Sequence, residues 1–204
     1  MRTLIIDYGM GNLLSVKRSF EKCGAKVFIS ENPADIKYAD YLVLPGVGAF
    51  KDGMANLRSK EWIPAIREAV IEYEIPLLGI CLGMQLLADK GYEIEETNGI
   101  GLIPGEVKRF EALSNNEKIP HVGWNEINVI NDETLFNSIK DKTDFYFVHS
   151  YHFIPKNKDD VLSTTPYCGR FVSAIGRKNI FGVQFHPEKS QTPGFKLICN
   201  FLKQ

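Results

Sequence analysis

The stretch Leu77–Leu87, LLGICLGMQLL, decides the fold and contains the first candidate for chemistry. The apolar run Pro76–Ile80 is typical of a buried parallel strand, and the residues that follow, Leu82–Ala88, favour a helix. A strand that passes directly into a helix is the building unit of an α/β fold. Cys81 lies at the junction, so it is either a small core residue or a nucleophile held on a turn.

Gly79 and Gly83 flank Cys81 in the pattern Gly-x-Cys-x-Gly, which has the shape of a nucleophile elbow with cysteine in place of serine. A side chain on so sharp a turn needs small neighbours, and both glycines meet that need. Free N–H groups at the start of the following helix would stabilise a thiolate and could bind an oxyanion. Free cysteines are also commonly buried and inert, so this motif alone leaves both interpretations open.

The sequence before this stretch alternates between strand-like and helix-like segments. We expect strands at 3–7, 27–29 and 41–44, and helices at 12–23, 50–58 and 62–73. This alternation favours a mostly parallel central sheet that is covered by helices on both faces.

The sequence after residue 100 changes character, because short strand-like runs follow one another. We expect strands at 106–110, 125–129, 145–148, 161–165, 172–177 and 180–184, with the last two forming a hairpin, and a closing helix at 194–202. No repeat, low-complexity segment or linker interrupts the pattern. The sequence therefore predicts one domain, residues 1–204, with antiparallel strands added in its C-terminal half.

Composition limits the classes of function. The formal net charge of −1 over 204 residues gives no electrostatic reason to expect nucleic acid or an anionic membrane as a partner. No apolar run approaches the length of a membrane span, and the first residues lack the pattern of a signal peptide. The four cysteines are Cys23, Cys81, Cys168 and Cys199, and they lack CxxC spacing. We therefore expect neither a disulfide framework nor structural zinc, and we expect a cytoplasmic location.

A base and its orienting carboxylate follow the last expected strand, in GVQFHPEKS. A thiol nucleophile needs a base, and the base needs a group that holds its tautomer. Pro187 restricts His186 to an extended conformation, so that Glu188, two residues on, can point the same way and reach the imidazole. A surface loop with a solvated carboxylate is the simpler alternative for this segment, but together with Cys81 it supplies the three roles of a triad.

The remaining histidines carry less weight. His149 and His152, in FVHSYHF, could suggest a metal pair, but alternation along one strand would place them on opposite faces and no further ligand lies at supporting spacing. We therefore expect no metal. His121, in PHVGWN, reads as a loop residue with local hydrogen bonds.

A glycine-containing loop, LPGVGAF, ends the third expected strand. Gly46 and Gly48 permit close approach of a ligand to the backbone, at the sheet edge where open α/β folds bind ligands. The loop lacks both the dinucleotide pattern and the Walker lysine, which argues against a nucleotide. It predicts a second wall of the cysteine site that supplies N–H groups, although a plain strand-to-helix turn would look the same.

Taken together, these stretches resemble the class I (triad-type) glutamine amidotransferases. GICLGMQLL is similar to the nucleophile elbow of that family, and GVQFHPEKS to its His-x-Glu segment. Within the family, DYGMGNL, PGVGAF, PHVGWN and HPEKS together resemble the glutaminase subunits of imidazole glycerol phosphate synthases, over nearly the whole chain. The resemblance implies a flavodoxin-like open sheet.

The resemblance also implies roles for individual residues. Cys81 would be the nucleophile, His186 the base and Glu188 its orienter, with the N–H groups of Leu82 and Val47 as oxyanion donors. Most family members have Pro-Gly-Gly where this chain has Pro-Gly-Val-Gly, and in this subunit the Val47 peptide would need to flip before its N–H could serve. Further residues resemble glutamine-holding positions, Gly46, Gly48, Gln85, His149, Ser150 and Tyr151, or positions near the synthase interface and ammonia passage, Asn12, Trp124, Tyr146 and Lys189.

The implied reaction hydrolyses L-glutamine through a cysteine thioester and needs no cofactor. The implied partner is a (β/α)₈-barrel cyclase subunit in a heterodimer, which would use the ammonia to make imidazole glycerol phosphate and aminoimidazole carboxamide ribotide in histidine biosynthesis. This chain has too few residues for such a barrel beside its own fold.

Three alternatives stay open at this point. The same glutaminase chemistry could serve a different synthase, for example one that amidates a sugar. An amidotransferase component of anthranilate, aminodeoxychorismate or pyridoxal phosphate synthesis is a further possibility, against which PGVG and PHVGWN argue. The third is a non-catalytic binding module on the same scaffold, which the presence of all three triad residues disfavours.

Overall fold

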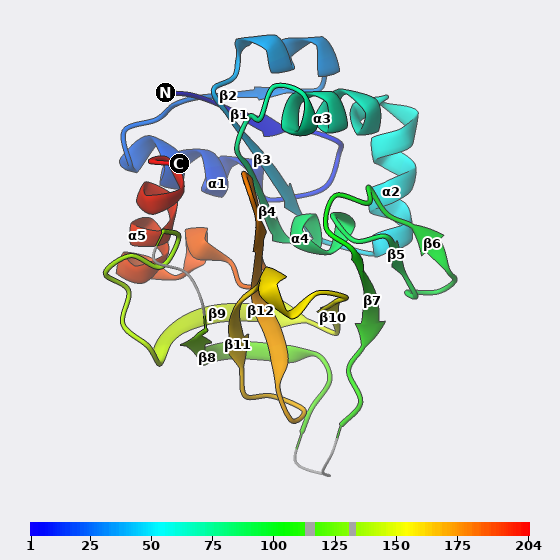
Figure 1. Ribbon diagram of the computed structural model, residues 1–204, viewed down its shortest axis with the longest axis vertical. Coiled ribbons are helices and arrows are strands. Elements are labelled where there is room, and N and C mark those ends of the chain that lie inside the picture. The colour runs from blue at the N-terminus through cyan, green and yellow to red at the C-terminus, as the bar shows by residue number, and fades with distance from the viewer. Residues whose placement is uncertain (113–116, 131–133) are drawn as a thin grey trace.

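The computed structural model describes residues 1–112, 117–130 and 134–204, and Figure 1 shows their arrangement around a long central sheet. One half of this nine-stranded sheet is parallel, with neighbours in the order β2 (Lys26–Ser30), β1 (Arg2–Ile6), β3 (Tyr41–Gly46), β4 (Leu77–Cys81) and β13 (Ile180–Val183). Numbered among themselves, these strands follow the flavodoxin-like order 2-1-3-4-5. The expected fold class is therefore confirmed.

The other half of the sheet is antiparallel and continues from β13 through β12 (Phe171–Arg177), β11 (Val161–Thr165), β8 (His121–Val129) and β9 (Thr143–His149). A second, four-stranded sheet has the order β10 (Tyr151–Pro155), β7 (Gly105–Arg109), β5 (Lys90–Gly91) and β6 (Thr97–Asn98). The added antiparallel strands were expected. The sequence did not predict β5, β6 or β10, and β8 begins four residues before the expected start at 125.

Helices cover both faces of the parallel half, as expected (Figure 1). They are α1 (Leu13–Lys22) and α5 (Gln191–Phe201) on one face, and α2 (Phe50–Ser59), α3 (Trp62–Ile71) and α4 (Leu82–Leu86) on the other, with 3₁₀ turns η1 (Pro33–Tyr38), η2 (Lys158–Asp160) and η3 (Pro187–Lys189) between elements. Nowhere in the described ranges does a helix have the length and apolar character that crossing a membrane requires.

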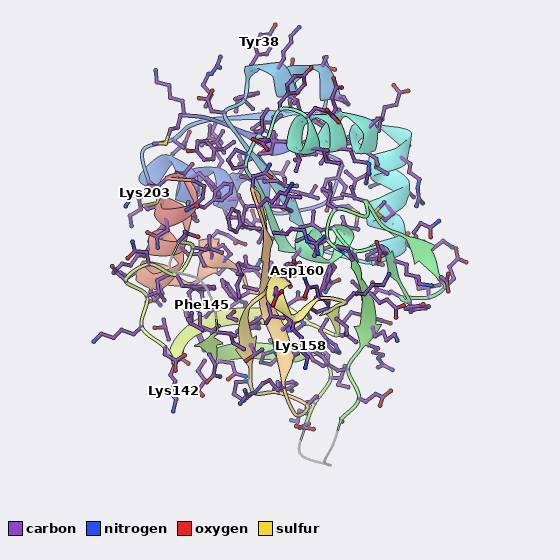
Figure 2. The ribbon with its side chains drawn as sticks, viewed as in Figure 1. Tyr38, Lys142, Phe145, Lys158, Asp160 and Lys203 are labelled. Atoms are coloured by element: carbon purple, nitrogen blue, oxygen red, sulfur yellow. A yellow bond between two sulfur atoms is a disulfide. The ribbon has the colours of Figure 1, made fainter. Side chains whose placement is uncertain are left out.

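Two apolar cores lie on opposite faces of the sheet because successive strand residues point in opposite directions. In β1, Leu4 and Ile6 pack with α2 and α3, whereas Ile5 packs with α1 and α5. The second core continues into the antiparallel half, where buried Phe145 of β9 lies with its ring centroid 4.1 Å from that of Phe185 (Figure 2). The two cores fix the carboxyl ends of the parallel strands, where the site lies.

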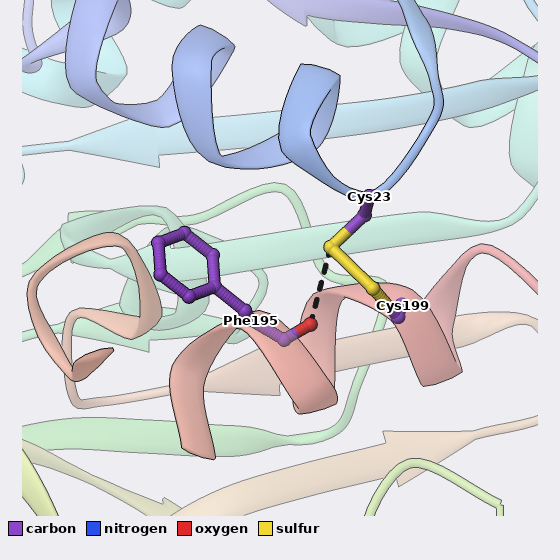
Figure 3. Close-up of a disulfide and its surroundings, with 3 residues drawn as sticks. All are labelled: Cys23, Phe195 and Cys199. Carbon is purple, nitrogen blue, oxygen red and sulfur yellow. Dashed lines mark hydrogen bonds between the residues drawn. A yellow bond between two sulfur atoms is a disulfide. The ribbon is translucent and has the colours of Figure 1, made fainter. Parts of the chain in front are cut away.

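A disulfide joins the ends of the two helices that share a face. Cys23, directly after α1, is bonded to Cys199 in α5, with 5.3 Å between the Cα atoms, and the Cys23 sulfur also lies 3.2 Å from the carbonyl oxygen of Phe195 (Figure 3). The sequence, from which we expected no disulfide framework, did not predict the bond between these two cysteines. Their separation of 176 residues hides the pairing in the sequence, since only the packing of α1 on α5 brings them together.

Candidate active site

Cys81 ends β4 and immediately precedes α4, in a backbone conformation that few residues other than glycine adopt. Its φ of 54° and ψ of −109° mark a sharp turn. A Cβ atom at Gly83 would overlap with the carbonyl oxygen of Leu44, and one at Gly79 would lie 2.7 Å from the carbonyl oxygen of Gly83. Both glycines are therefore required by this turn. The elbow has the predicted geometry, although α4 ends at Leu86, two residues before the expected end.

His186 and Glu188 lie together directly after β13, which is the neighbour of β4. His186 has the expected extended backbone, and its Nδ1 lies 2.8 Å from Oε1 of Glu188. Both side chains are almost fully buried, at 4% and 2% exposure. Within the described part of the chain, His186 Nε2 and Glu188 Oε2 have no hydrogen-bond partner. The hydrogen bond fixes the ring and leaves Nε2 available for another group.

The electrostatic environment favours a charged His186. Burial by itself lowers the pKa of the imidazole, but its interactions with Cys81 and with the Glu188 carboxylate outweigh burial and raise that pKa to about 10. At neutral pH this favours the imidazolium form of His186. The imidazolium is a proton donor next to Cys81, the candidate nucleophile.

A cavity of about 520 Å³ opens onto the cysteine and brings together most of the residues named from the sequence. It is lined by Val47, Gly48, Ala49, Cys81, Gln85, Glu93, Val148, His149, Ser150, Tyr151 and His186. The end of β3 forms one wall, and the passage from β9 to β10 forms the opposite wall. The volume suits a small molecule such as an amino acid.

Glu93 lines this cavity and was not predicted from the sequence. Its Oε2 accepts a hydrogen bond of 2.7 Å from the backbone N–H of Phe50, at the start of α2. Glu93 lies just after the two-residue strand β5, in a segment that carries no recognisable motif. Its carboxylate places a negative charge at the cavity, opposite in sign to the amino group of an amino acid.

The loop after β3 has its positive φ at a glycine and leaves Val47 exposed. Val47 is not among the residues with positive φ, whereas Gly48 has a φ of 111°. Val47 exposes 45% of its surface. Gly46 is not part of the large cavity; it is buried, and a Cβ atom there would overlap with the hydroxyl of Tyr8. The positive φ of this loop is thus carried by a glycine, which adopts it without strain.

Three of the four residues named near the interface lie close together. The rings of Trp124 and Tyr146 are 6.0 Å apart in an edge-to-face arrangement, and Nζ of Lys189 lies 5.6 Å from the Tyr146 ring centroid. Asn12 caps α1 with its side chain, which accepts from the N–H of Ser15. Asn12 and Lys189 both border a cavity of about 10 Å³ that also touches Gly46, Val47, His186 and Glu188.

The structure corrects the interpretation of the other histidines. His149 ends β9 and His152 belongs to β10, so the two residues are not on one strand, and both contact the ring of Phe110. His121 lies in β8 rather than in a loop, is buried, and its Nδ1 is 3.1 Å from Nε2 of His149. In residues 1–112, 117–130 and 134–204, no group of three or more His, Cys, Asp or Glu side chains could hold a metal ion.

Comparisons with known proteins identify the family of the chain. The model of the glutamine amidotransferase class-I family matches residues 4–204. The chain is 48% identical, over 98% of both chains, to imidazole glycerol phosphate synthase subunit HisH 1 of Campylobacter jejuni, and 49% identical to subunit HisH of Moorella thermoacetica, over 97% of this chain and 92% of that one.

A solved structure confirms the fold independently. The structure of PurLQS from Thermotoga maritima superposes with a TM-score of 0.79 at 20% identity, covering 99% of this chain and 97% of that chain. The chain therefore belongs to the class-I glutamine amidotransferases and, within them, to the family of the imidazole glycerol phosphate synthase subunits named HisH.

Proposed function

We propose that this protein is the glutaminase subunit of an imidazole glycerol phosphate synthase, which hydrolyses L-glutamine and passes the ammonia to a cyclase subunit. The observation that carries the proposal is the buried His186–Glu188 pair beside Cys81, at one cavity, in a chain similar to such subunits over 98% of its length.

In the proposed mechanism, the Cys81 thiolate attacks the side-chain carbonyl carbon of glutamine. Backbone N–H groups of Leu82 and Val47 hold the oxyanion that forms. The His186 imidazolium then gives its proton to the departing amino group, so that ammonia leaves and a glutamyl thioester remains. The same imidazole takes a proton from water as water attacks the thioester, and glutamate leaves with return of the thiolate.

Glutamine would be held between the two walls of the cavity. Gln85, His149, Ser150 and Tyr151 form one side of the proposed binding site, and Gly46 and Gly48 belong to the loop on the other. The Glu93 carboxylate would attract the α-ammonium group of the substrate. In this arrangement, the substrate's amide end faces Cys81.

The proposed contact surface for the cyclase is the exposed apolar patch on β8 and β9. Val122, Trp124 and Val148 expose 56%, 49% and 36% of their surface, and Val122 pairs with Val148 across the strands. Exposed apolar patches of this kind mark interaction sites. Tyr146 contacts both Trp124 of this patch and Lys189, and Lys189 and Asn12 border the small cavity that also touches His186 and Glu188. In this proposal, ammonia would pass on this side of the molecule to a (β/α)₈-barrel partner in a cytoplasmic heterodimer.

The test separates glutamine hydrolysis from synthesis. Cys81→Ala, assembled with the cyclase, should abolish product formation from glutamine and leave formation from added ammonium salts intact. Loss of both activities in a folded complex would contradict the division of labour. Complementation of a histidine auxotroph separates this acceptor from a different synthase, such as one that amidates a sugar.

Labelling distinguishes an enzyme from a non-catalytic binding module. A glutamine-analogue electrophile such as diazo-oxo-norleucine should modify Cys81 in the complex, as detected by mass spectrometry of the peptide. The matched control is Cys168, which is the other free cysteine and should stay unmodified. An unmodified Cys81 in the complex would favour the module.

A further inference from the structure

A buried amide lies beside the Cys81 sulfur and belongs to none of the roles described so far. Gln184 directly follows β13 and exposes none of its surface. Its Nε2 is 3.7 Å from Sγ of Cys81, within the range of a hydrogen bond to sulfur, and its Oε1 accepts a hydrogen bond of 2.9 Å from Gln85. Gln184 is thus buried next to the cysteine and is not among the residues that line the cavity.

The orientation of this amide is fixed by Gln85. Nε2 of Gln85 donates to the carbonyl oxygen of Tyr151 at 3.0 Å and to Oε1 of Gln184 at 2.9 Å. A backbone carbonyl only accepts, so the atom that faces it must be the amide nitrogen, whose two hydrogens are then both used. Gln184 must present its oxygen to Gln85, and its own N–H group therefore faces Cys81.

The Tyr151 carbonyl also fixes the tautomers of two histidines, His149 and His121. Nδ1 of His149 lies 2.8 Å from this oxygen and must carry the hydrogen, which makes Nε2 of the neutral ring an acceptor for Nδ1 of His121. Nε2 of His121 in turn accepts from Nδ2 of Asn125 at 3.2 Å. Burial lowers the pKa of His121 to about 4 and that of His149 to about 3, so both rings stay neutral at pH 7.

We propose that Gln184 is a further catalytic residue, whose N–H group donates a hydrogen bond to the Cys81 thiolate. The hydrogen-bonded chain from Asn125 through His121, His149, the Tyr151 carbonyl and Gln85 holds that N–H group in place. The inference rests on the proposed glutaminase function and deepens it. A hydrogen bond to the charged form stabilises that form, so Gln184 increases the fraction of reactive thiolate.

Other titratable groups interact with Cys81, line the same cavity or contact His186, and they stay unchanged when only residue 184 is replaced. From the elements around the cysteine they are Tyr8 after β1, Glu93 after β5, His149 at the end of β9, and His186 with Glu188 after β13. A change in the pH dependence of Cys81 reactivity that is caused by one substitution at position 184 therefore reports on the Gln184 amide.

The experiment measures the pH profile of Cys81 alkylation in Gln184→Met, which keeps the length of the side chain and removes the donor. Iodoacetamide labelling of the whole chain is followed by mass spectrometry of the Cys81 peptide. We expect the pH midpoint to rise by about one unit, as for the loss of one hydrogen bond to a charged group. Cys168 in the same sample is the internal control, and its profile should not move. Ser173→Ala, which removes a buried hydrogen bond on the neighbouring strand, is the control variant.

Gln184→Glu is the second variant, with the same shape and a carboxylate in place of the amide. It should move the midpoint upward further than Gln184→Met does, because like charges repel. The inference would be overturned if a folded Gln184→Met or Gln184→Glu variant had the same pH midpoint of Cys81 alkylation as the wild type. A wild-type complex that labels normally but fails to hydrolyse glutamine would instead contradict the proposed function, so the two failures are distinguishable.

Discussion

Nδ1 of His186 lies 2.8 Å from Oε1 of Glu188, and both side chains are buried beneath the cavity that contains Cys81. A buried carboxylate on this nitrogen fixes the tautomer of the ring and stabilises its charged form. Because the two residues follow one strand and are two positions apart, their geometry depends on a short piece of backbone. Other features of the site depend on contacts between distant parts of the chain.

Glu188→Gln should reduce glutamine hydrolysis in the complex by roughly 10²- to 10⁴-fold, because the amide neither favours the imidazolium nor holds its tautomer as a carboxylate does. The measurement is the rate of glutamate release across pH. Synthesis from ammonium salts in the same variant is the control and should be unchanged. A rate of glutamate release that is within about twofold of wild type would contradict the role of Glu188.

Gly83→Ala should destabilise the protein strongly, because the new Cβ would overlap with the backbone carbonyl of Leu44 in β3. Overpacking against backbone should cost about 3 kcal/mol or more of unfolding free energy, measured in urea. The matched control is Gly53→Ala in α2, whose Cβ would lie 3.2 Å from the flexible side chain of Leu86. We expect the control to change stability by at most about 1 kcal/mol, since alanine favours a helix. Equal effects of both variants would be inconsistent with the elbow geometry.

Stability should fall as the pH is lowered from about 6.5 towards 4. Burial lowers the pKa of His121, His149 and His152 to about 4, 3 and 4, so in this window the unfolded chain binds more protons than the folded one. The slope can reach about 4 kcal/mol per pH unit if all three titrate. His152→Phe keeps the stacking on Phe110 and removes one titrating group. The dependence of its unfolding free energy on pH should therefore correspond to about one proton fewer than in the wild type. An unchanged slope in this variant would mean that His152 does not contribute to the loss of stability at low pH.

Reduction of the Cys23–Cys199 bond should lower the free energy of unfolding by about 2–4 kcal/mol, because the bond closes a loop across most of the chain. Urea unfolding with and without dithiothreitol measures the difference. Cys23→Ser should match the reduced protein and should not respond to dithiothreitol. A wild-type stability that is equal in both conditions would show that the two thiols are unbonded in solution.

The sequence predicted the features that depend on neighbouring residues. Periodicity located the parallel strands and their helices, and small residues around Cys81 identified the elbow, because both signals are local. It missed the pairing of Cys23 with Cys199 and the hydrogen bond between His121 and His149, since each joins residues that only the tertiary fold brings together. Glu93 was missed because a lone carboxylate after a two-residue strand has no pattern of its own. The assumption that His149 and His152 share a strand was wrong because the chain changes sheets between them.

That change of sheets has a mechanical consequence. Only Ser150 separates the end of β9 in the large sheet from the start of β10 in the small one. The wall of the cavity opposite Val47 is therefore the junction between the two sheets, whereas Cys81 ends β4, an inner strand of the large sheet that pairs with β3 and β13. A displacement of the β8–β9 ribbon, whose apolar side chains lie at the surface, would move this wall of the cavity, including the Val148 carbonyl oxygen that lies 3.9 Å from Sγ of Cys81. A molecule bound at this surface would thus act on the cavity wall across a single connecting residue, Ser150.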